Sequence, residues 1–255
     1  MNNYIIKTNT TNEKGGINAM TENLRIVKNV AIVLLEVPVK VRKLSLSNGK
    51  TAKLINHPIL PDCGIINAPE DKEQPFYSIM SSDANMQKAI QRYKGFIEEA
   101  ENIDAIFLLI NRPYRLQFLE LIQRGLSPDE MGELLVYLWV DSENPNNSAV
   151  SLPTLIKWFK KASKQSLMDA EELAYYNLLP DEFTVYRGIG SKTNKKGISY
   201  TLSLEKAEWF ANRFQQDGYV LTGTAKKKDV LAYLNGREEQ TILIEPKNIA
   251  SLHKM

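Results

Sequence analysis

Side chains of a strand alternate between its two faces, and this alternation predicts a strand near the carboxyl end of the chain. One of its faces is apolar and also carries an arginine. From Phe183 to Arg187, the period of two puts Phe183, Val185 and Arg187 on the same side. An arginine that follows two core residues needs an anionic partner there, unless it extends past the strand end into solvent. Gly188 and Gly190 come next and predict a turn at which backbone can approach a ligand closely.

A second strand is predicted over 198–204. Its apolar residues alternate with Ser199, Thr201 and Ser203, which share the opposite face. Ser203 is also a good N-cap for a helix whose apolar residues recur at helical spacing from Ala207 onward. A row of hydroxyls can hold a ribose or a carboxylate, and it is equally common as the polar face of an edge strand. Both interpretations stay open for this stretch alone.

A third strand follows an acidic turn. Asn235 and Gly236 predict the turn, Glu238 and Glu239 come next, and the apolar run 242–244 is the strand. A carboxylate at the mouth of a strand can stabilise a developing positive charge or accept a proton. An acidic pair beside a turn is otherwise usually solvated surface.

In this order, the three stretches resemble the Arg-Ser-Glu branch of the ADP-ribosyltransferase superfamily, above all the transferase-like domains of bacteriophage and prophage proteins. The resemblance covers residues 181 to about 250. It rests on Tyr-Arg-Gly at 186–188, Gly-Ile-Ser-Tyr-Thr at 197–201 and Ala-Glu-Trp-Phe-Ala at 207–211. It implies a glycosyltransferase that takes NAD as its substrate and passes ADP-ribose to an acceptor.

The resemblance also implies roles for individual residues. Arg187 matches the arginine that holds the NAD phosphates and the nicotinamide ribose, and Gly188 lies beside it. Ser199 and Thr201 match the strand that braces the NAD pocket and the catalytic glutamate. Glu238 is counted with these NAD-binding residues.

The acidic motif departs from the family pattern of Glu-x-Glu or Gln-x-Glu. One register gives Arg237-x-Glu239 and makes Glu239 the catalytic acid, acting with Arg187 and Ser199. The other register gives Glu239-x-Thr241 and puts a threonine in the acid position. We favour the first. The implied reaction loosens the bond between ribose and nicotinamide while Glu239 stabilises the charge on the ribose; with water as acceptor, the protein would be an NAD glycohydrolase.

The whole chain is predicted to be α+β. We expect a flexible N-terminus at 1–20, a small β region at 21–75, a helical region at 76–180 and an ADP-ribosyltransferase-like core at 181–255. That core is expected to be a mixed β-sandwich of two small sheets with the site in the cleft between them. In analogy with the superfamily, the helical region would help to cover NAD or to dock the target.

Hydrophobic spacing predicts the elements of the first three regions. Strands are expected at Leu24–Val30, Ile32–Leu46 and Thr51–Ile55. Helices are expected at Ala84–Ala100, Pro113–Arg124, Pro128–Trp139, Leu152–Ser163 and Ser166–Asn177. Ser127 is the cap of the third helix and Pro128 its first residue. Four aromatic residues could extend a ligand cleft, although aromatic residues at this spacing are usually core: Tyr137, Trp139, Trp158 and Phe159.

Composition limits the remaining possibilities. The chain has 255 residues, of which 43% are hydrophobic, and a net charge of +2, which is too small to indicate a nucleic-acid or membrane partner. The single cysteine, Cys63, excludes an internal disulfide, and with two histidines beside it a structural zinc site is implausible. No signal peptide or membrane-spanning run is recognisable. We therefore expect a soluble protein of the bacterial host cytoplasm that uses no metal.

Three hypotheses stay open on the sequence. The first is an ADP-ribosyltransferase that modifies a protein or nucleic acid. The second is a non-catalytic relative that binds NAD, a nucleic acid or a protein. The third is a structural phage protein that retains only the fold.

Overall fold

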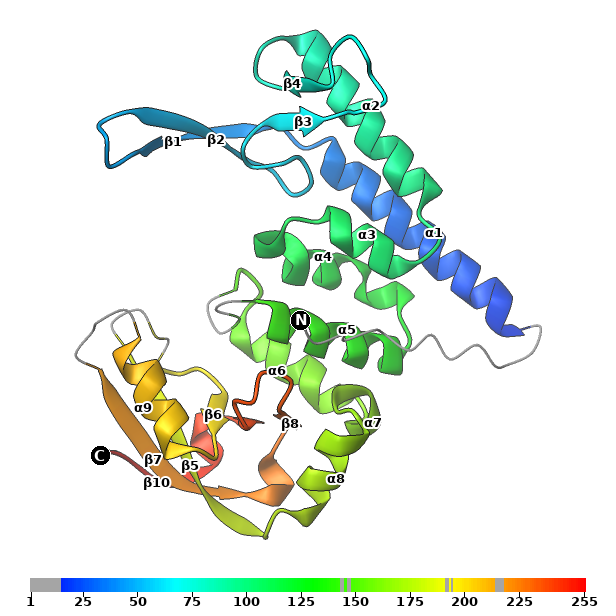
Figure 1. The fold of residues 1–255 in the computed structure, drawn as a ribbon. Helices are drawn as coiled ribbons and strands as arrows, with labels where there is room; N and C mark the ends of the chain where they lie inside the picture. Colours follow the sequence, from blue (N-terminus) through cyan, green and yellow to red (C-terminus); the bar gives the residue numbers. More distant parts are fainter. Residues whose placement is uncertain (1–14, 143–144, 146–147, 191–192, 194, 214–217) are drawn as a thin grey trace. The chain divides into compact units, whose positions relative to one another are not determined.

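The chain forms two compact units, shown in Figure 1. The computed structural model describes residues 15–142, 145, 148–190, 193, 195–213 and 218–255. Of these, 15–125 belong to one unit and 126–255 to the other. Most of the expected flexible N-terminus, up to residue 14, lies outside the described residues, and residues 15–20 are helical.

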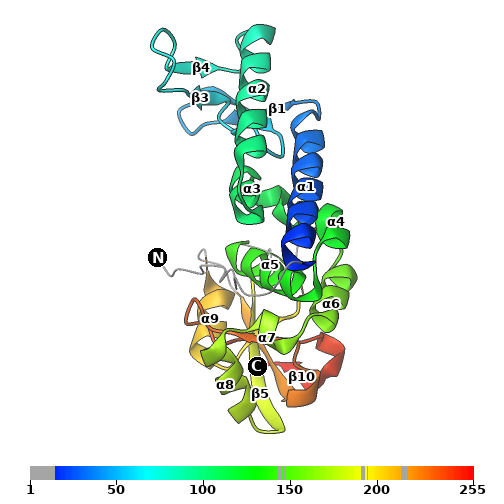
Figure 2. The ribbon, with the colours of Figure 1, turned by 90° about the vertical axis from the view of Figure 1, so that its right-hand side faces the viewer.

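Among its described residues, the first unit combines four helices with two antiparallel hairpins. The helices are α1 (Gly15–Leu35), α2 (Asp83–Glu99), α3 (Ile103–Leu109) and α4 (Arg115–Ile122), and the hairpins pair β1 (Lys40–Ser45) with β2 (Thr51–Asn56) and β3 (Ile65–Asn67) with β4 (Phe76–Ser78). Short 3-10 turns cover Arg112–Tyr114 and Gln123–Gly125. Helix α1 packs against α2, α3 and α4, and Figure 2 shows α1 beside α2.

The strand predicted at Leu24–Val30 is wrong, because this stretch belongs to α1. Its many β-branched residues favour a strand, but Val27, Ala31 and Leu35 follow one another at intervals of four and are all fully buried. That spacing puts them on one helical face, and burial of the face against neighbouring helices outweighs local propensity. The strand predicted at Ile32–Leu46 is accordingly reduced to β1, after α1 has ended before Pro38.

The second unit contains five helices and six strands among its described residues. The helices are α5 (Pro128–Asp141), α6 (Leu152–Lys161), α7 (Lys164–Leu167), α8 (Ala170–Leu178) and α9 (Leu204–Asn212), and the strands are β5 (Glu182–Ile189), β6 (Ser199–Thr201), β7 (Tyr219–Lys226), β8 (Ala232–Leu234), β9 (Thr241–Leu243) and β10 (Ile249–Lys254). The 3-10 turns Lys227–Asp229 and Pro246–Asn248 follow β7 and precede β10. Helices and an antiparallel sheet together make the chain α+β, as predicted.

Two helix starts agree with the sequence. Ser127 caps α5 in a capping box with Glu130, and Pro128 is the first helical residue. Ser203 caps α9 by accepting a hydrogen bond from the N–H of Lys206. Both serines supply an acceptor to backbone N–H groups that have no partner inside the helix.

The helix predicted at Ser166–Asn177 is two helices, α7 and α8. The chain leaves the helical conformation at Met168, and Asp169 then caps α8 in a capping box with Glu172. A side-chain acceptor at Asp169 stabilises a new helix start, which the apolar spacing does not indicate. The predicted helical region 76–180 is likewise divided, since α2–α4 lie in the first unit and α5–α8 in the second.

The strands of the second unit form one antiparallel sheet in the order β10-β7-β5-β6-β9-β8. β5 pairs with β7 along its whole length, and β6 pairs with β9 through three residues. β5 and β6 share a single pair, Tyr186 with Thr201. Instead of the two expected sheets, the described residues of this unit form one sheet whose two halves are joined by a single residue pair.

Helix α9 packs closely on β5 because Gly188 has no side chain. A Cβ at this position would lie 2.2 Å from the backbone O of Ala207 and 2.5 Å from the backbone N of Ala211. Both alanines are fully or almost fully buried and form a small core with Val220 of β7. Gly188 thus sets the distance between the helix and the strand.

Within the described residues, none of the helices has both the length and the apolar character that crossing a bilayer requires.

Candidate functional site

Arg187 is a buried cation in the middle of the sheet. Strand alternation turns it to the same side as Val185, and only 6% of it is exposed. Its Nη1 donates a hydrogen bond to the backbone O of Ser199, and its guanidinium carbon lies 5.6 Å from the ring centroid of Tyr200. Burial lowers the pKa of Arg187, because the charged form loses hydration. A cation in this position attracts an anion more strongly than one in water.

The hydroxyl of Tyr200 is a second polar group at this point. The residue is 2% exposed, and its oxygen has no hydrogen-bond partner among the described residues. Burial also raises the pKa of Tyr200, with the charge of Arg187 partly opposing the shift. Buried polar atoms are normally paired, so the hydroxyl of Tyr200 is an exception among the described residues.

Thr201 connects β6 to the loop that carries the acidic residues. Its hydroxyl donates to the backbone O of Glu239 at 2.7 Å and accepts from the N–H of Ser203 at 3.0 Å. The N–H of Leu202 donates to the backbone O of Gln240 at 3.1 Å. Thr201 therefore helps to hold the backbone at Glu239 in place. Its hydroxyl already makes two hydrogen bonds, one as donor and one as acceptor.

The loop between β8 and β9 has an unusual backbone. Glu238 has a φ of 56° and Gln240 a φ of 47°, both in the left-handed region that side chains other than glycine seldom adopt. Asn235 stabilises this shape, because its backbone O accepts from the N–H of Glu238 at 2.8 Å and its side chain accepts from the N–H of Gln240 at 3.1 Å. Strain that is held by surrounding bonds is typical of binding and catalytic loops.

Between these two strained residues, Glu239 turns inward and is half-buried. Burial raises the pKa of Glu239, and the positive charges of Arg237, Lys206 and Arg213 partly oppose the shift. The carboxyl group thus has basic residues nearby and limited access to water. These are the conditions in which a carboxylate interacts strongly with a bound charge.

One cavity of about 280 Å³ brings these residues together. Arg187, Ser199 and Glu239, the predicted catalytic set, all line it, and so do Gly188 and Thr201. They come from β5, β6 and the loop before β9, which are neighbours in the sheet. The single residue pair that joins β5 and β6, Tyr186 with Thr201, lies in the lining of the cavity. Its volume is close to the lower end of the range for small-molecule sites, about 300–1,000 Å³.

Two of the predicted NAD-binding residues, Glu238 and Gly188, lie in surroundings that differ from the prediction. Glu238 does not line the cavity and is exposed, because the reversal of the backbone on either side of Glu239 directs the two neighbouring carboxyl groups differently. Gly188 does line the cavity, but it lies in β5, where it pairs with Val220, and not in the predicted turn. Its lack of a side chain is required by α9.

Several lining residues were not recognised from the sequence. The end of α5 and the residues after it contribute Trp139, Val140, Ser142 and Pro145, and α9 and the residue that caps its end contribute Phe210 and Arg213. Of these, only Trp139 was a candidate from the sequence, as an aromatic residue that could extend a cleft. In the sequence, Arg213 looks like any surface arginine at a helix end. Their role depends on how α5 and α9 pack on the sheet, which spacing along the chain does not indicate.

A comparison of the chain with protein-family models, with curated proteins and with solved structures finds no match.

Proposed function

We propose that the protein is an ADP-ribosyltransferase that takes NAD into the cavity between β5 and β6. The observation that carries the proposal is the meeting of Arg187, Ser199 and Glu239 in one cavity, from three segments that are neighbours in the sheet. The sequence resemblance assigns roles to the same three residues.

The charges of the cavity suit a substrate with a diphosphate. Arg187, Arg213 and Arg237 all line it. Guanidinium groups bind phosphate oxygens through paired donors, and such bonds gain strength where water is scarce. Tyr200 also lines the cavity, and its hydroxyl has no partner among the described residues.

Glu239 would act on the ribose. As the bond from the ribose carbon to nicotinamide breaks, the bonding electrons leave with nicotinamide and the ribose becomes positively charged. A carboxylate at this point stabilises that charge. The acceptor then forms the new bond to the ribose carbon and loses a proton. The acceptor is an unidentified protein or nucleic acid, and the proposed setting is the cytoplasm of a bacterium that carries the phage or prophage.

A non-catalytic NAD-binding protein is the second candidate, and one observation favours it. Thr241, which the other register puts in the acid position, also lines the cavity and pairs directly with Thr201 across the two strands. A threonine has no charge with which to stabilise the ribose.

Transfer from labelled NAD to bacterial lysate tests the proposal. We compare the wild type with Arg187→Lys, Glu239→Gln and Glu238→Gln. The last variant is a matched control, because Glu238 is the adjacent glutamate outside the cavity. We expect Glu239→Gln to reduce transfer roughly 100-fold or more and Glu238→Gln to leave it unchanged.

A binding titration with intact NAD separates the two candidates if no label is transferred. Saturable binding that Arg187→Lys weakens identifies a non-catalytic NAD-binding protein. Absence of binding to the wild type contradicts both.

A further inference from the structure

The β1–β2 hairpin of the first unit concentrates positive charge. The segment 37–61 contains five basic residues and no acidic one. The basic residues are Lys40, Arg42, Lys43, Lys50 and Lys53. All five are exposed, and Figure 1 shows the hairpin extending away from α1 and α2 of the same unit. We call residues 40–56 the basic ribbon.

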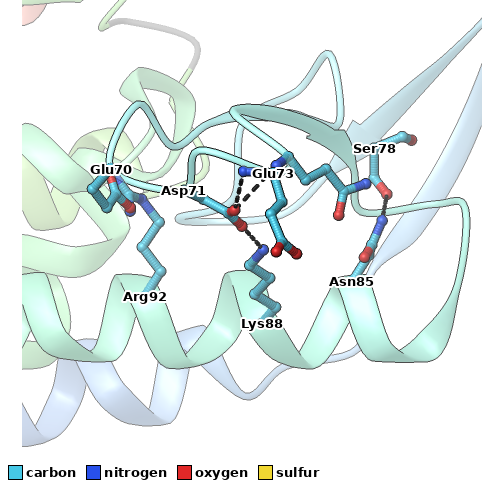
Figure 3. A network of polar contacts seen from close by, with 8 residues as sticks. Glu70, Asp71, Glu73, Ser78, Asn85, Lys88 and Arg92 are labelled. Atoms are coloured by element: carbon cyan, nitrogen blue, oxygen red, sulfur yellow. Dashed lines mark hydrogen bonds and ion pairs between the residues drawn. The ribbon is translucent and has the colours of Figure 1, made fainter.

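The cations of α2 in the same unit form ion pairs with carboxylates. Figure 3 shows Lys88 of α2 paired with Asp71, and Arg92 of α2 paired with Glu70. In the part of the chain that the structure describes, no carboxylate forms an ion pair with a cation of the basic ribbon. The ribbon therefore has an excess of positive charge that α2 does not have.

The register of the hairpin places two of these cations directly opposite each other. Lys43 pairs with Lys53, and Ser45 pairs with Thr51 two residues further on. All four side chains therefore lie on one face. Like charges in a direct cross-strand pair are destabilising, and a bound anion would remove this repulsion. The hydroxyls beside the lysines are suited to bond with the same anion.

We propose that the basic ribbon binds double-stranded nucleic acid through its phosphates. Duplex nucleic acid presents closely spaced negative charges, and binding releases the counterions that surround them. A two-stranded ribbon, with about 4.8 Å between its strands, fits into the major groove of B-DNA, which is about 12 Å wide. Cations on both faces and at the turn can then reach the backbones on either side.

The composition of the ribbon favours a duplex over other anionic partners. Residues 40–56 contain no aromatic residue, whereas proteins that bind single strands stack bases on aromatic rings. Three large apolar residues of the ribbon are exposed: Val41 and Leu44 on opposite faces of β1, and Leu46 directly after the strand. They do not gather into the apolar face that insertion into a lipid surface requires. The lysines also weaken the ribbon as an edge for the addition of a peptide strand.

The net charge of the whole chain hides this feature. A value of +2 results from 32 basic and 30 acidic residues. The acidic residues are absent from the ribbon, so its local charge is much higher than the average. Electrostatic binding depends on this local charge, because salt at moderate concentration limits the reach of charges elsewhere in the chain to about 10 Å.

Fluorescence anisotropy with a labelled mixed-sequence DNA duplex tests the proposal, using the full chain without NAD. The test variant is Lys43→Gln with Lys53→Gln. The matched control is Lys72→Gln with Lys94→Gln, which removes the same charge from the same unit but outside the ribbon. Thermal melting of both variants shows whether they fold, and the test variant should be at least as stable as the wild type because it loses the repulsion between Lys43 and Lys53.

We expect duplex binding that weakens steeply with salt. Each phosphate contact contributes about −0.9 to the slope of log K against log salt, so the test variant should lose about 2 units of slope while the control keeps it. No duplex binding at low salt, or an equal loss in the control, overturns the proposal. Tighter binding to an oligothymidylate strand, to polyglutamate or to phosphatidylserine vesicles than to the duplex also overturns it. Since NAD is absent from the measurement, the result is independent of the proposed transferase activity.

Discussion

The carboxylate of Glu172 in α8 accepts a hydrogen bond from the backbone N–H of Asn235, with 2.6 Å between Oε1 and N. Glu172 is 4% exposed and also closes the capping box of α8. Asn235 in turn bonds to Glu238 and Gln240, on either side of Glu239. A residue of the helical segment therefore holds the loop that directs Glu239 into the cavity.

Replacement of Glu172 should loosen this loop. In Glu172→Ala the N–H of Asn235 loses its acceptor, and we expect the free energy of unfolding to fall by about 1–3 kcal/mol. Hydrogen exchange at the amides of Asn235 and Gln240 should become faster. Asp169→Ala is the control, because it removes the N-cap of the same helix but leaves the bond to Asn235. Equal exchange at Gln240 in both variants would mean that Glu172 supports only the helix.

Replacement of Gly188 should separate α9 from the sheet. An added Cβ lies 2.2 Å from the O of Ala207, which is backbone and has little freedom to move. We expect Gly188→Ala to lower the free energy of unfolding in denaturant titration by about 3 kcal/mol or more. Gly95→Ala is the opposite case, because nothing lies within 4 Å of that Cβ and the site is inside α2. It should raise stability by about 1 kcal/mol at most.

The pH dependence of transfer should reflect the carboxyl group of Glu239. Burial raises its pKa above the ordinary value of 4.5. If the reaction needs the carboxylate, the rate falls as the pH is lowered through this raised pKa. Arg237 lowers the pKa by its charge, so Arg237→Gln should move the acid limb of the rate profile to higher pH. The measurement is the initial rate of transfer between pH 4 and pH 8, approximately the range in which carboxyl groups and histidines titrate. An acid limb that stays in place in Arg237→Gln contradicts the assignment to Glu239.

The raised pKa of Glu239 also affects the stability of the protein, and this effect can be measured without an activity assay. Because the pKa of Glu239 is higher in the folded chain than in the unfolded chain, the folded state holds the proton more tightly. The contribution of Glu239 to stability is therefore greatest at low pH and is lost as the pH rises through the folded pKa. At pH 7, Glu239→Gln should be more stable than the wild type, as is common for residues retained for function. The difference between the two proteins in the free energy of unfolding should shrink toward pH 4, and a constant difference would contradict the shift.

The sequence named the predicted catalytic residues of the candidate site but missed most of the lining that α5 and α9 contribute. Strand alternation placed Arg187 on the buried face with Val185, and the order of the three motifs singled out Ser199 and Glu239. The motif assigned the catalytic role to Glu239 and counted Glu238 among the NAD-binding residues, but it did not indicate that Glu239 lines the cavity and Glu238 does not. The distinction comes from the left-handed backbone at Glu238 and Gln240, which depends on bonds to Asn235.

Segments with a strong local preference were also the source of errors. The β-branched residues of 24–30 predicted a strand, whereas burial of Val27, Ala31 and Leu35 against other helices made it part of α1. Local preference amounts to less than about 1 kcal/mol per residue, and burial of a large apolar side chain contributes about 1.5–3 kcal/mol. Packing therefore decides wherever the two disagree.

By itself, the sequence determined the α+β class, the caps of α5 and α9, and the chemistry available to the site, because these depend on residues that are neighbours along the chain. It also contained the charge of the basic ribbon, which the total charge concealed. Only the tertiary structure decided that α5–α8 belong with the sheet, that one residue pair joins the two halves of the sheet, and that Glu172 holds the loop of Glu239. These features arise from contacts between residues far apart in the sequence, and their geometry is fixed by packing that no local pattern records.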